Sequence, residues 1–499
     1  MEGALAQRVR AVRLDELETT AWATPALLLA LTAISLFIRT RILNAGFWID
    51  EGLSVGIAHH PLTSIPHLLR QDGSPPLYYM LLHVWIGWFG DGERATHALS
   101  LVFALACIPL AYWVATSLFG RVAGWVCAVL AAFDPYVTYY AQETRMYTLL
   151  AALSLLTAVA YVHGVLRGRR GWLPLLVASF VLTLYTHNWG LFVCVALAVS
   201  TVLFARERWR EALIAGAATL VLYAPWLPTL LSQVRHTGAP WSTAPNFHAL
   251  VTAPGAVLAG DAPLMAFVLA GGSGLVAVVR RRDSERTAVL ALAVWIGVTI
   301  LLAWLFSQLT PAWASRYLAV VLGPILLLPA VGLARAGRLG LVALVAVIFL
   351  WMGEDQKDDK SNARAIAAGV APYVHPGDLV LSTHPEEVPV LRYYLGPGLR
   401  WATEMGPVRD PQVMDWRDAL ARLRATSTRR DLVPLLASVR PGQRLIVFSP
   451  VFRDYRAWKA KWTNEVFLRS TVWTAAIPRD PRFRVVRTVR SDEILLKRN

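Results

Sequence analysis

Long apolar segments recur through most of the chain, separated by short stretches that are rich in arginine, proline or polar residues. A helix needs about 20 predominantly apolar residues to cross the hydrocarbon core of a bilayer. The pattern therefore predicts a polytopic α-helical membrane protein with about eleven transmembrane helices. The predicted spans cover residues 23–43, 95–119, 122–133, 147–166, 172–185, 190–205, 212–231, 263–279, 288–309, 318–334 and 339–352.

Two of these spans are separated only by a short polar break. The apolar run from residue 173 to residue 205 is too long for a single helix across a membrane. Thr186, His187 and Asn188 interrupt this run, and Gly190 follows them, which favours a tight turn. We therefore predict two helices that are joined near His187.

The hydropathy falls sharply after Met352, and the pattern changes from long apolar runs to alternating helix and strand. We predict strands over residues 378–382, 444–449, 483–489 and 493–496, and helices over residues 362–373 and 386–395. Such an alternation is typical of a small α/β domain, to which we assign residues 353–499. It shows no phosphate-binding loop, nucleophile elbow or metal-ligand spacing. Its expected role is to bind the acceptor or to cover a cavity in the membrane part.

The composition supports a membrane location. Hydrophobic residues make up 56% of the 499 residues, and 20 of them are tryptophan, which lies outside the usual range for soluble domains. Cys107, Cys127 and Cys194 all fall within apolar spans, so they predict neither disulfide bonds nor a metal site.

The basic residues predict how the chain is threaded through the membrane. Arginine groups in the short loops all fall on one side when eleven spans are threaded alternately, and such groups stay preferentially in the cytoplasm. This places residues 1–22 in the cytoplasm of a multi-pass plasma (inner) membrane protein. The loop at residues 44–94 and the α/β domain are then extracytoplasmic, and residues 23–352 form the transmembrane part. The net charge of +15 is explained by these arginines, so nucleic acid is not an expected partner.

The most prominent polar feature is an acidic pair, Asp50 and Glu51, in the first external loop directly after the first span. Carboxylates at a membrane boundary are a natural source of chemistry. The alternative is that Asp50 only caps an interfacial helix that begins near Leu53.

A second polar group is expected to face this pair. Glu143 and Arg145 lie at the outer end of the fourth span, and His187 and Arg316 lie near the outer ends of other spans. Arg145 and Arg316 could bind an anion, and Glu143 a metal ion or a hydroxyl group. The alternative for both arginines is that they snorkel to the membrane interface.

These motifs resemble those of the GT-C glycosyltransferases, specifically the branch similar to families 39 and 83. That branch includes protein O-mannosyltransferases, aminoarabinose transferases that act on lipid A, and rhizobial core-polysaccharide transferases. The resemblance depends on the stretches WIDE at residues 48–51, SPPLYY at residues 74–79 and QETRMY at residues 142–147. Weaker similarities are Ser315-Arg316-Tyr317 and Thr186-His187. It covers about residues 25–335, and Ser74 stands where many relatives carry a histidine.

The resemblance implies a catalytic site in which each residue has a defined role. Asp50 is expected to be the catalytic base, Glu51 its neighbour and Glu143 the second acid, with Mg²⁺ or Mn²⁺ as a candidate ligand of Glu143. The donor phosphate is assigned to Arg145, Arg316 and His187. The substrate cavity is assigned to the aromatic residues Trp48, Tyr78, Tyr79 and Tyr147.

The expected activity follows from these assignments. An inverting enzyme would move a sugar from a polyprenyl-monophosphate donor to a hydroxyl of a glycan, lipid or protein, with membrane lipids around it. The residues leave other functions open. These are a transporter or flippase for a lipid-linked sugar, a glycan polymerase or ligase that uses a diphosphate-linked donor, and a purely structural membrane scaffold.

Overall fold

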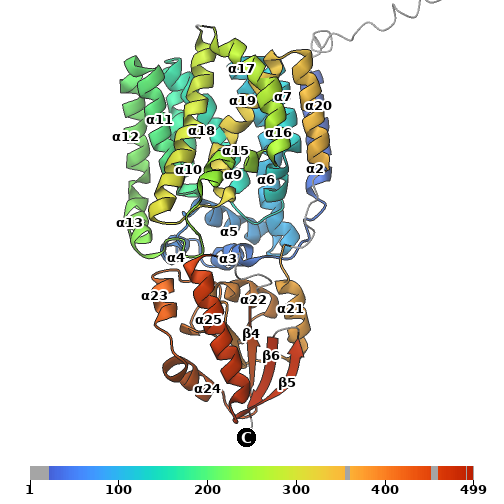
Figure 1. Ribbon diagram of the computed structural model, residues 1–499, viewed down its shortest axis with the longest axis vertical. Coiled ribbons are helices and arrows are strands. Elements are labelled where there is room, and N and C mark those ends of the chain that lie inside the picture. Colours follow the sequence, from blue (N-terminus) through green and yellow to red (C-terminus); the bar gives the residue numbers. More distant parts are fainter. Residues whose placement is uncertain (1–21, 282, 354–359, 451–458, 490–491, 498–499) are drawn as a thin grey trace, which may run out of the picture.

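The computed structural model describes residues 22–281, 283–353, 360–450, 459–489 and 492–497. It consists of a bundle of long helices above a smaller region that contains a β-sheet, with three loop helices between the two (Figure 1). All but Trp22 of the predicted cytoplasmic segment 1–22 lies outside the described residues.

The bundle is built from apolar helices that match the predicted spans in position. They are α2 (Ala23–Arg39), α6 (Glu93–Phe119), α7 (Arg121–Phe133), α9 (Tyr147–Tyr161) with η1 (Val162–Leu166), α10 (Leu173–Thr186), α11 (Gly190–Phe204), α12 (Trp209–Tyr223), α13 (Leu227–His236), α16 (Asp261–Ala266) with η5 (Phe267–Gly271) and α17 (Gly272–Val279), α18 (Ser284–Leu309), η6 (Ser315–Val321) with α19 (Leu322–Arg335), and α20 (Arg338–Met352). The predicted break near His187 is confirmed, because α10 ends at Thr186 and α11 begins at Gly190.

Six helical stretches of the described chain are long and apolar enough to cross a membrane. They are Glu93–Phe119, Tyr147–Leu166, Arg206–His236, Asp261–Val279, Ser284–Leu309 and Ser315–Arg335. The other five predicted spans coincide with apolar helices of 10–17 residues, and Leu77–Phe89 is a further helix of this kind. The protein is thus a multi-pass membrane protein, but the count of eleven spans stays a prediction.

Burial separates the central helices from those that face lipid. Helix α9 is almost fully buried and packs against α6, α10 and α19. By contrast, α12 exposes Leu213, Leu220 and Val221, as expected of a helix surrounded by hydrocarbon. Where α17 crosses α19, the backbones at Gly274 and Gly332 approach so closely that a Cβ atom on Gly274 would lie 1.9 Å from a carbonyl oxygen.

The loop between α2 and α6 forms three short helices beneath the bundle (Figure 1). These are α3 (Ile49–Ala58), α4 (Ile65–Asp72) and α5 (Leu77–Phe89). Helix α4 ends at Gly73, whose φ of 101° is accessible to glycine at little cost, and the chain then turns into Ser74 and Pro75. This turn brings the SPPLYY motif against the end of the bundle.

The C-terminal region contains a six-stranded sheet in the order β3-β2-β1-β4-β6-β5. Strand β1 pairs in parallel with β2 and β4, whereas the pairs β2–β3, β4–β6 and β5–β6 are antiparallel. The strands are β1 (Leu379–Ser382), β2 (Arg400–Thr403), β3 (Gly406–Val408), β4 (Arg444–Phe448), β5 (Phe483–Val489) and β6 (Asp492–Lys497). The helices of this region are α21 (Ala363–Val370), α22 (Val388–Leu395), α23 (Ala419–Arg424), α24 (Val433–Ala437) and α25 (Lys461–Ala476).

Alternate residues of the central strands build a core on each face of the sheet. Leu379 and Leu445 point to the face covered by Trp473 of α25, and Val380 and Ile446 point to the face covered by Val370 of α21. The four predicted strands are present. The short strands β2 and β3 and the helix α25 were not predicted, because β3 contains Pro407 at the sheet edge and α25 has no clear apolar periodicity.

Candidate active site

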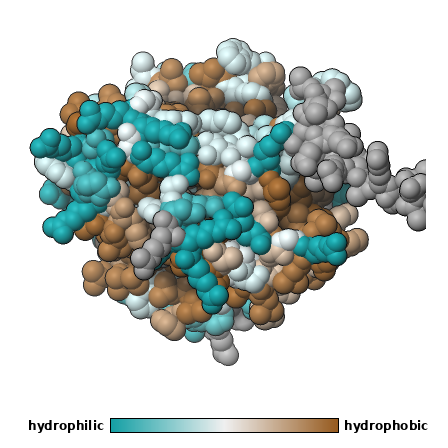
Figure 2. Space-filling model, turned by 90° about the horizontal axis from the view of Figure 1, so that it is seen from above, coloured by the Kyte–Doolittle hydropathy of each residue, from teal (hydrophilic) through white to brown (hydrophobic). Residues whose placement is uncertain are grey.

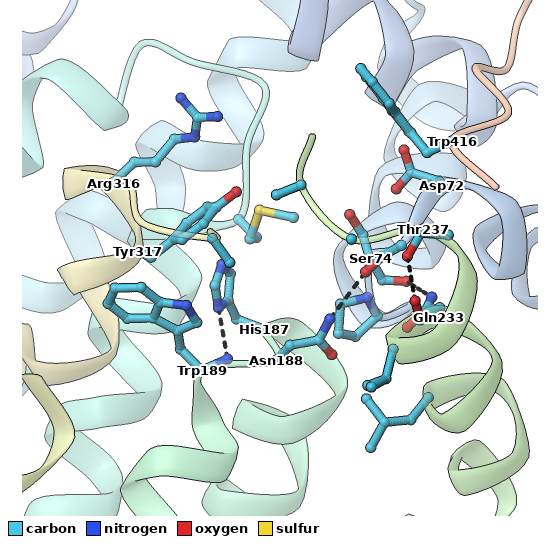
Figure 3. Close-up of a pocket in the computed structure, with 18 of the residues that line it drawn as sticks. Asp72, Ser74, His187, Asn188, Trp189, Gln233, Thr237, Arg316, Tyr317 and Trp416 are labelled. Carbon is cyan, nitrogen blue, oxygen red and sulfur yellow. Dashed lines mark hydrogen bonds between the residues drawn. The ribbon is translucent and has the colours of Figure 1, made fainter. Parts of the chain in front are cut away.

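A cavity of about 350 Å³ lies where the bundle meets the loop helices. Its walls come from α3, the turn after α4, the loop before α9, the α10–α11 turn, α13 and η6 (Figure 3). Its polar lining residues include Asp50, Asp72, Ser74, Arg145, His187, Asn188, Gln233, Thr237, Thr310, Arg316 and Tyr317.

Asp50 faces two guanidinium groups at this cavity. Its Oδ2 atom lies 3.8 Å from Nη2 of Arg145 and 3.6 Å from Nη2 of Arg316. The Nε atoms of both arginines are buried and lack a hydrogen-bond partner among the described residues. Guanidinium groups with free donors favour a planar or tetrahedral anion, so this pair can accept a phosphate beside Asp50.

Each arginine is held by its surroundings. Arg145 donates to Oγ of Ser54 at 2.9 Å and to the Tyr79 hydroxyl at 3.4 Å. Arg316 lies over the rings of Trp48 at 5.5 Å and Trp241 at 4.9 Å, which are cation–π contacts. The two positive charges are therefore positioned before any ligand arrives, which lowers the cost of binding an anion.

His187 is a neutral hydrogen-bond donor at the same cavity. The backbone N–H of Trp189 donates to Nδ1 of His187 at 3.1 Å, so the ring proton resides on Nε2. Burial lowers the pKa of His187 to about 3, and the charges of Arg145 and Arg316 act in the same direction. The imidazole can thus donate one hydrogen bond without adding a charge.

Glu51 lies next to Asp50 in sequence but points away from the cavity. Its side chain is fully buried, and Oε1 accepts hydrogen bonds from Nε2 of His97 at 2.7 Å, the Thr144 N–H at 2.8 Å and Nζ of Lys360 at 2.9 Å. Oε2 accepts from the Trp48 N–H at 3.2 Å, which caps α3. Burial alone would raise the pKa of Glu51, but His97 and Lys360 outweigh it and lower this pKa to about 2.

This arrangement corrects two expectations. Glu51 is not among the residues that line the cavity, so we reassign it from the catalytic group to a role in positioning α3. Helix α3 begins at Ile49 with Trp48 as its N-cap, so Asp50 is not the cap of a helix that starts near Leu53. The carboxylate of Asp50 is left available for the cavity.

Glu143 is buried behind the cavity and does not line it. Both of its carboxylate oxygens lack a hydrogen-bond partner among the described residues. Burial raises the pKa of Glu143 to about 8, with a further rise from the negative charge of Glu51 and an opposing effect of Lys360. A carboxyl group in these surroundings is protonated at neutral pH.

The predicted Mg²⁺ or Mn²⁺ at Glu143 stays a prediction. Across the described ranges, no group of three or more His, Cys, Asp and Glu side chains could hold a metal ion. Mg²⁺ commonly keeps several waters and binds one or two carboxylates together with substrate phosphates, so such a group is not required. Asp50 faces Arg145 and Arg316, which place two positive charges at the cavity.

The raised pKa of Glu143 predicts a pH-dependent stability. The native state binds its proton more tightly than the unfolded chain, whose pKa is near the ordinary 4.5. The native state therefore loses stability as the pH rises from about 4.5 to about 8, and Glu143→Gln removes this loss. Melting temperatures in detergent should show an advantage of the variant that grows from pH 5 to pH 8 and then levels off. If the melting temperatures of the wild type and Glu143→Gln differed by the same amount at every pH, this would contradict the raised pKa of Glu143.

The structure thus brings together some of the predicted site residues and not others. Asp50, Arg145, His187 and Arg316 share the cavity. The predicted aromatic residues do not line it: Trp48 packs on Arg316, Tyr79 binds Arg145, Tyr147 meets Tyr140 edge to face, and Tyr78 contacts Ser100.

Sequence reasoning missed several polar residues of the cavity and its support. Asp72, Asn188 and Gln233 line the cavity, and Lys360 and His97 hold Glu51. Asp72 directly precedes the Gly73-Ser74-Pro75 turn, and Asn188 follows His187, so adjacency to motifs was a signal for both. Gln233 and Lys360 carried no such signal.

The fold of the chain is similar to that of solved membrane-protein structures. The sequence matches no protein-family model, and no curated protein is significantly similar to it. Among solved structures, the chain is similar to ArnT from Cupriavidus metallidurans. The apo form aligns with 15% identity and a TM-score of 0.62 over 95% of this chain and 98% of that one. The form bound to undecaprenyl phosphate gives a TM-score of 0.63. The arabinofuranosyltransferase AftD from Mycobacteria aligns over 95% of this chain and 40% of its own, with 14% identity and a TM-score of 0.53.

Proposed function

We propose that this protein is an inverting glycosyltransferase that moves a sugar from a polyprenyl-monophosphate donor to a hydroxyl group of a cell-envelope glycan, lipid or protein. The observation that carries this proposal is the convergence of Arg145 and Arg316 on Asp50 at a cavity open to apolar surroundings. Such a reaction requires three parts: an anion site, an available carboxylate and an apolar wall for the lipid. The fold shared with ArnT, which was solved bound to undecaprenyl phosphate, supports the same class of donor.

The chemistry follows from the positions of these groups. Asp50 takes the proton of the acceptor hydroxyl as its oxygen forms a bond to the anomeric carbon. The bond between that carbon and the phosphate oxygen breaks, and its electron pair leaves with the lipid phosphate. Arg145 and Arg316 stabilise the charge that develops on this leaving group, and Nε2–H of His187 donates one more hydrogen bond. A single displacement inverts the configuration at the anomeric carbon.

The lipid tail is assigned to the apolar side of the cavity. Leu191 and Phe192 of α11 and Phe306 of α18 line this side. Leu191 is 36% exposed and Phe306 is 41% exposed. A hydrocarbon chain can therefore run from the cavity into the surrounding lipid without crossing polar surface.

The orientation of the site is supported by the basic loops. Arg335 donates to the Phe119 carbonyl and pairs with Glu285 at 2.6 Å, and Arg167 donates to the Leu118 carbonyl, so several arginine-bearing loops lie together. Hydrophilic residues spread across this end of the bundle, which lies opposite the C-terminal sheet (Figures 1 and 2). With these loops in the cytoplasm, the cavity and the sheet are extracytoplasmic.

The proposal is tested by transfer of radiolabelled sugar from a panel of synthetic polyprenyl-phosphate sugars into membranes that contain the protein and native acceptors. We expect transfer from at least one monophosphate donor, with inversion at the anomeric carbon. The orientation is tested in sealed spheroplasts with an impermeant maleimide, in a Cys194→Ala background. The Arg440→Cys variant should react, because residue 440 is then extracytoplasmic. The Glu207→Cys variant should not react. Transfer only from diphosphate donors, or none from folded protein, would contradict the proposal.

A further inference from the structure

Three buried oxygen atoms without hydrogen-bond partners among the described residues belong to side chains that line the same cavity. They are Oδ2 of Asp72, Oδ1 of Asn188 and Oε1 of Gln233, which we call the oxygen cluster. Asp72 and Gln233 lie across the cavity from Arg316 and Tyr317, with Asn188 between the two sides (Figure 3). Burying an acceptor without a partner is unfavourable, so three such acceptors on side chains of one cavity favour a ligand that brings hydrogen-bond donors.

The two amides are fixed with their oxygens as the free atoms. Nδ2 of Asn188 donates to the Gly73 carbonyl at 3.0 Å, and Nε2 of Gln233 donates to the Leu69 carbonyl at 2.8 Å. A flipped amide would place oxygen against oxygen in both cases, so the assignment follows from the network. Both carbonyls belong to the end of α4, the segment that also carries Asp72. The oxygen cluster therefore presents acceptors only.

A site made of hydrogen-bond acceptors does not suit the phosphate part of the sugar donor. An ionised phosphate has no hydrogen to donate, and it already has Arg145 and Arg316 on the other side. The sugar ring, in contrast, presents several O–H donors. With the phosphodiester bound between the arginines, the sugar extends from it toward the oxygen cluster.

The charge of the site restricts the sugar further. The charged groups among the lining residues are two carboxyl groups, Asp50 and Asp72, and two guanidinium groups, Arg145 and Arg316, so a bound phosphodiester leaves no excess positive charge. Burial raises the pKa of Asp72, and the nearby charge of Arg145 opposes this rise. A carboxylate on the sugar would add a second negative charge opposite Asp72, in surroundings with little water to screen it.

We propose that Asp72, Asn188 and Gln233 form the sugar subsite of this enzyme and select a sugar that offers hydrogen-bond donors and bears no negative charge. This inference rests on the proposed function, and it identifies the part of the cavity that recognises the sugar. The recognised donors are ring hydroxyls or an ammonium group, which share the same chemistry toward oxygen acceptors.

The test compares binding of two ligands to purified full-length protein in detergent: undecaprenyl phosphate, and the tightest binder from a panel of undecaprenyl-phosphate hexoses and pentoses. Gln233→Leu and Asp72→Ala should each weaken binding of the sugar-bearing lipid about three- to tenfold, since each removes about one hydrogen bond. Binding of bare undecaprenyl phosphate should change less than twofold in Gln233→Leu, and it should stay the same or tighten in Asp72→Ala, which removes a carboxyl group near Arg145. Gln308→Leu is the matched control, because Gln308 also donates to a backbone carbonyl, that of Pro245, but lies outside the cavity lining.

A second arm tests the charge restriction. The wild-type protein should bind undecaprenyl-phosphate glucuronic acid at least tenfold more weakly than the glucose analogue, and Asp72→Asn should reduce this difference. Asp72→Asn should leave a hydroxyl-bearing donor within a few-fold of its original affinity, because the amide oxygen still accepts. A selective loss of an amine-bearing donor in Asp72→Asn would identify an ammonium group as the recognised donor.

The outcomes separate this inference from the proposed function. Equal weakening of both lipids in the variants, or a wild type that binds sugar-bearing and bare lipid equally, would overturn the sugar subsite. A wild type that prefers the sugar-bearing lipid and loses this preference in the variants, yet transfers no sugar to any acceptor, would overturn the transferase and leave the subsite intact.

Discussion

Asp50→Asn is expected to reduce sugar transfer by about 10²- to 10⁴-fold, the usual contribution of a general base. The amide cannot take the proton of the acceptor hydroxyl, although its size and position are retained. The variant also removes the carboxylate that competes for Arg145 and Arg316, so its affinity for undecaprenyl phosphate should stay the same or rise. A fall in kcat without weaker lipid-phosphate binding separates a base from a residue that only binds the donor.

The control for this variant is Asp480→Asn. Asp480 also forms an ion pair, with Arg482 at 2.6 Å, but it lies beside β5, outside the cavity lining. Its substitution should leave kcat within a factor of two. If Asp50→Asn retains transfer, another carboxylate of the cavity is the base. Asp72 is the other carboxylate that lines this cavity.

Glu51→Gln is expected to destabilise the protein by about 3–5 kcal/mol, because removing one partner of a buried ion pair leaves the other charge uncompensated. Lys360 is 2% exposed and Glu51 is fully buried. The same carboxylate binds the Thr144 N–H and caps α3, so it joins three segments that are far apart in the sequence. The measurement is thermal unfolding in detergent, with transfer activity recorded at a temperature where the variant is folded.

Two comparisons make this prediction specific. Glu285→Gln removes the ion pair with Arg335, which is 34% exposed, and should cost less than about 1 kcal/mol. Adding Lys360→Met to Glu51→Gln should restore part of the loss, since removing both charges avoids an unpaired buried one. A Glu51→Gln variant as stable as the wild type would contradict the role assigned to this cluster.

The role of Glu51 also explains why two adjacent acids behave so differently. Successive residues of a helix are about 100° apart around its axis, so Asp50 and Glu51 cannot face the same way. The fold places the cavity on one side of α3 and His97, Thr144 and Lys360 on another. A displacement of α3 by about 1 Å can cost about 100-fold in rate, so the buried cluster also supports the position of Asp50.

The sequence by itself determined the class of the protein and its main elements. Runs of apolar residues specify membrane helices because only a helix satisfies its backbone hydrogen bonds in hydrocarbon, and six of the predicted spans are long and apolar enough in the structure. Strands β1, β4, β5 and β6 were readable because they are short apolar or alternating runs between turn residues. The sequence could predict that Asp50, Arg145, His187 and Arg316 lie close together, because they stand at predicted span ends within or beside recognisable motifs.

Only the tertiary structure decided which side chains meet. Lys360 reaches Glu51 across 309 positions of the sequence, and Asn188 meets the end of α4 across 115 positions, so no local pattern could indicate either contact. At the oxygen cluster, the amide nitrogens of Asn188 and Gln233 donate to backbone carbonyls at the end of α4, which leaves the two amide oxygens free. Local sequence fixes where a polar residue stands on its own helix, whereas packing between distant segments determines whether that residue is satisfied, buried or free to bind a ligand.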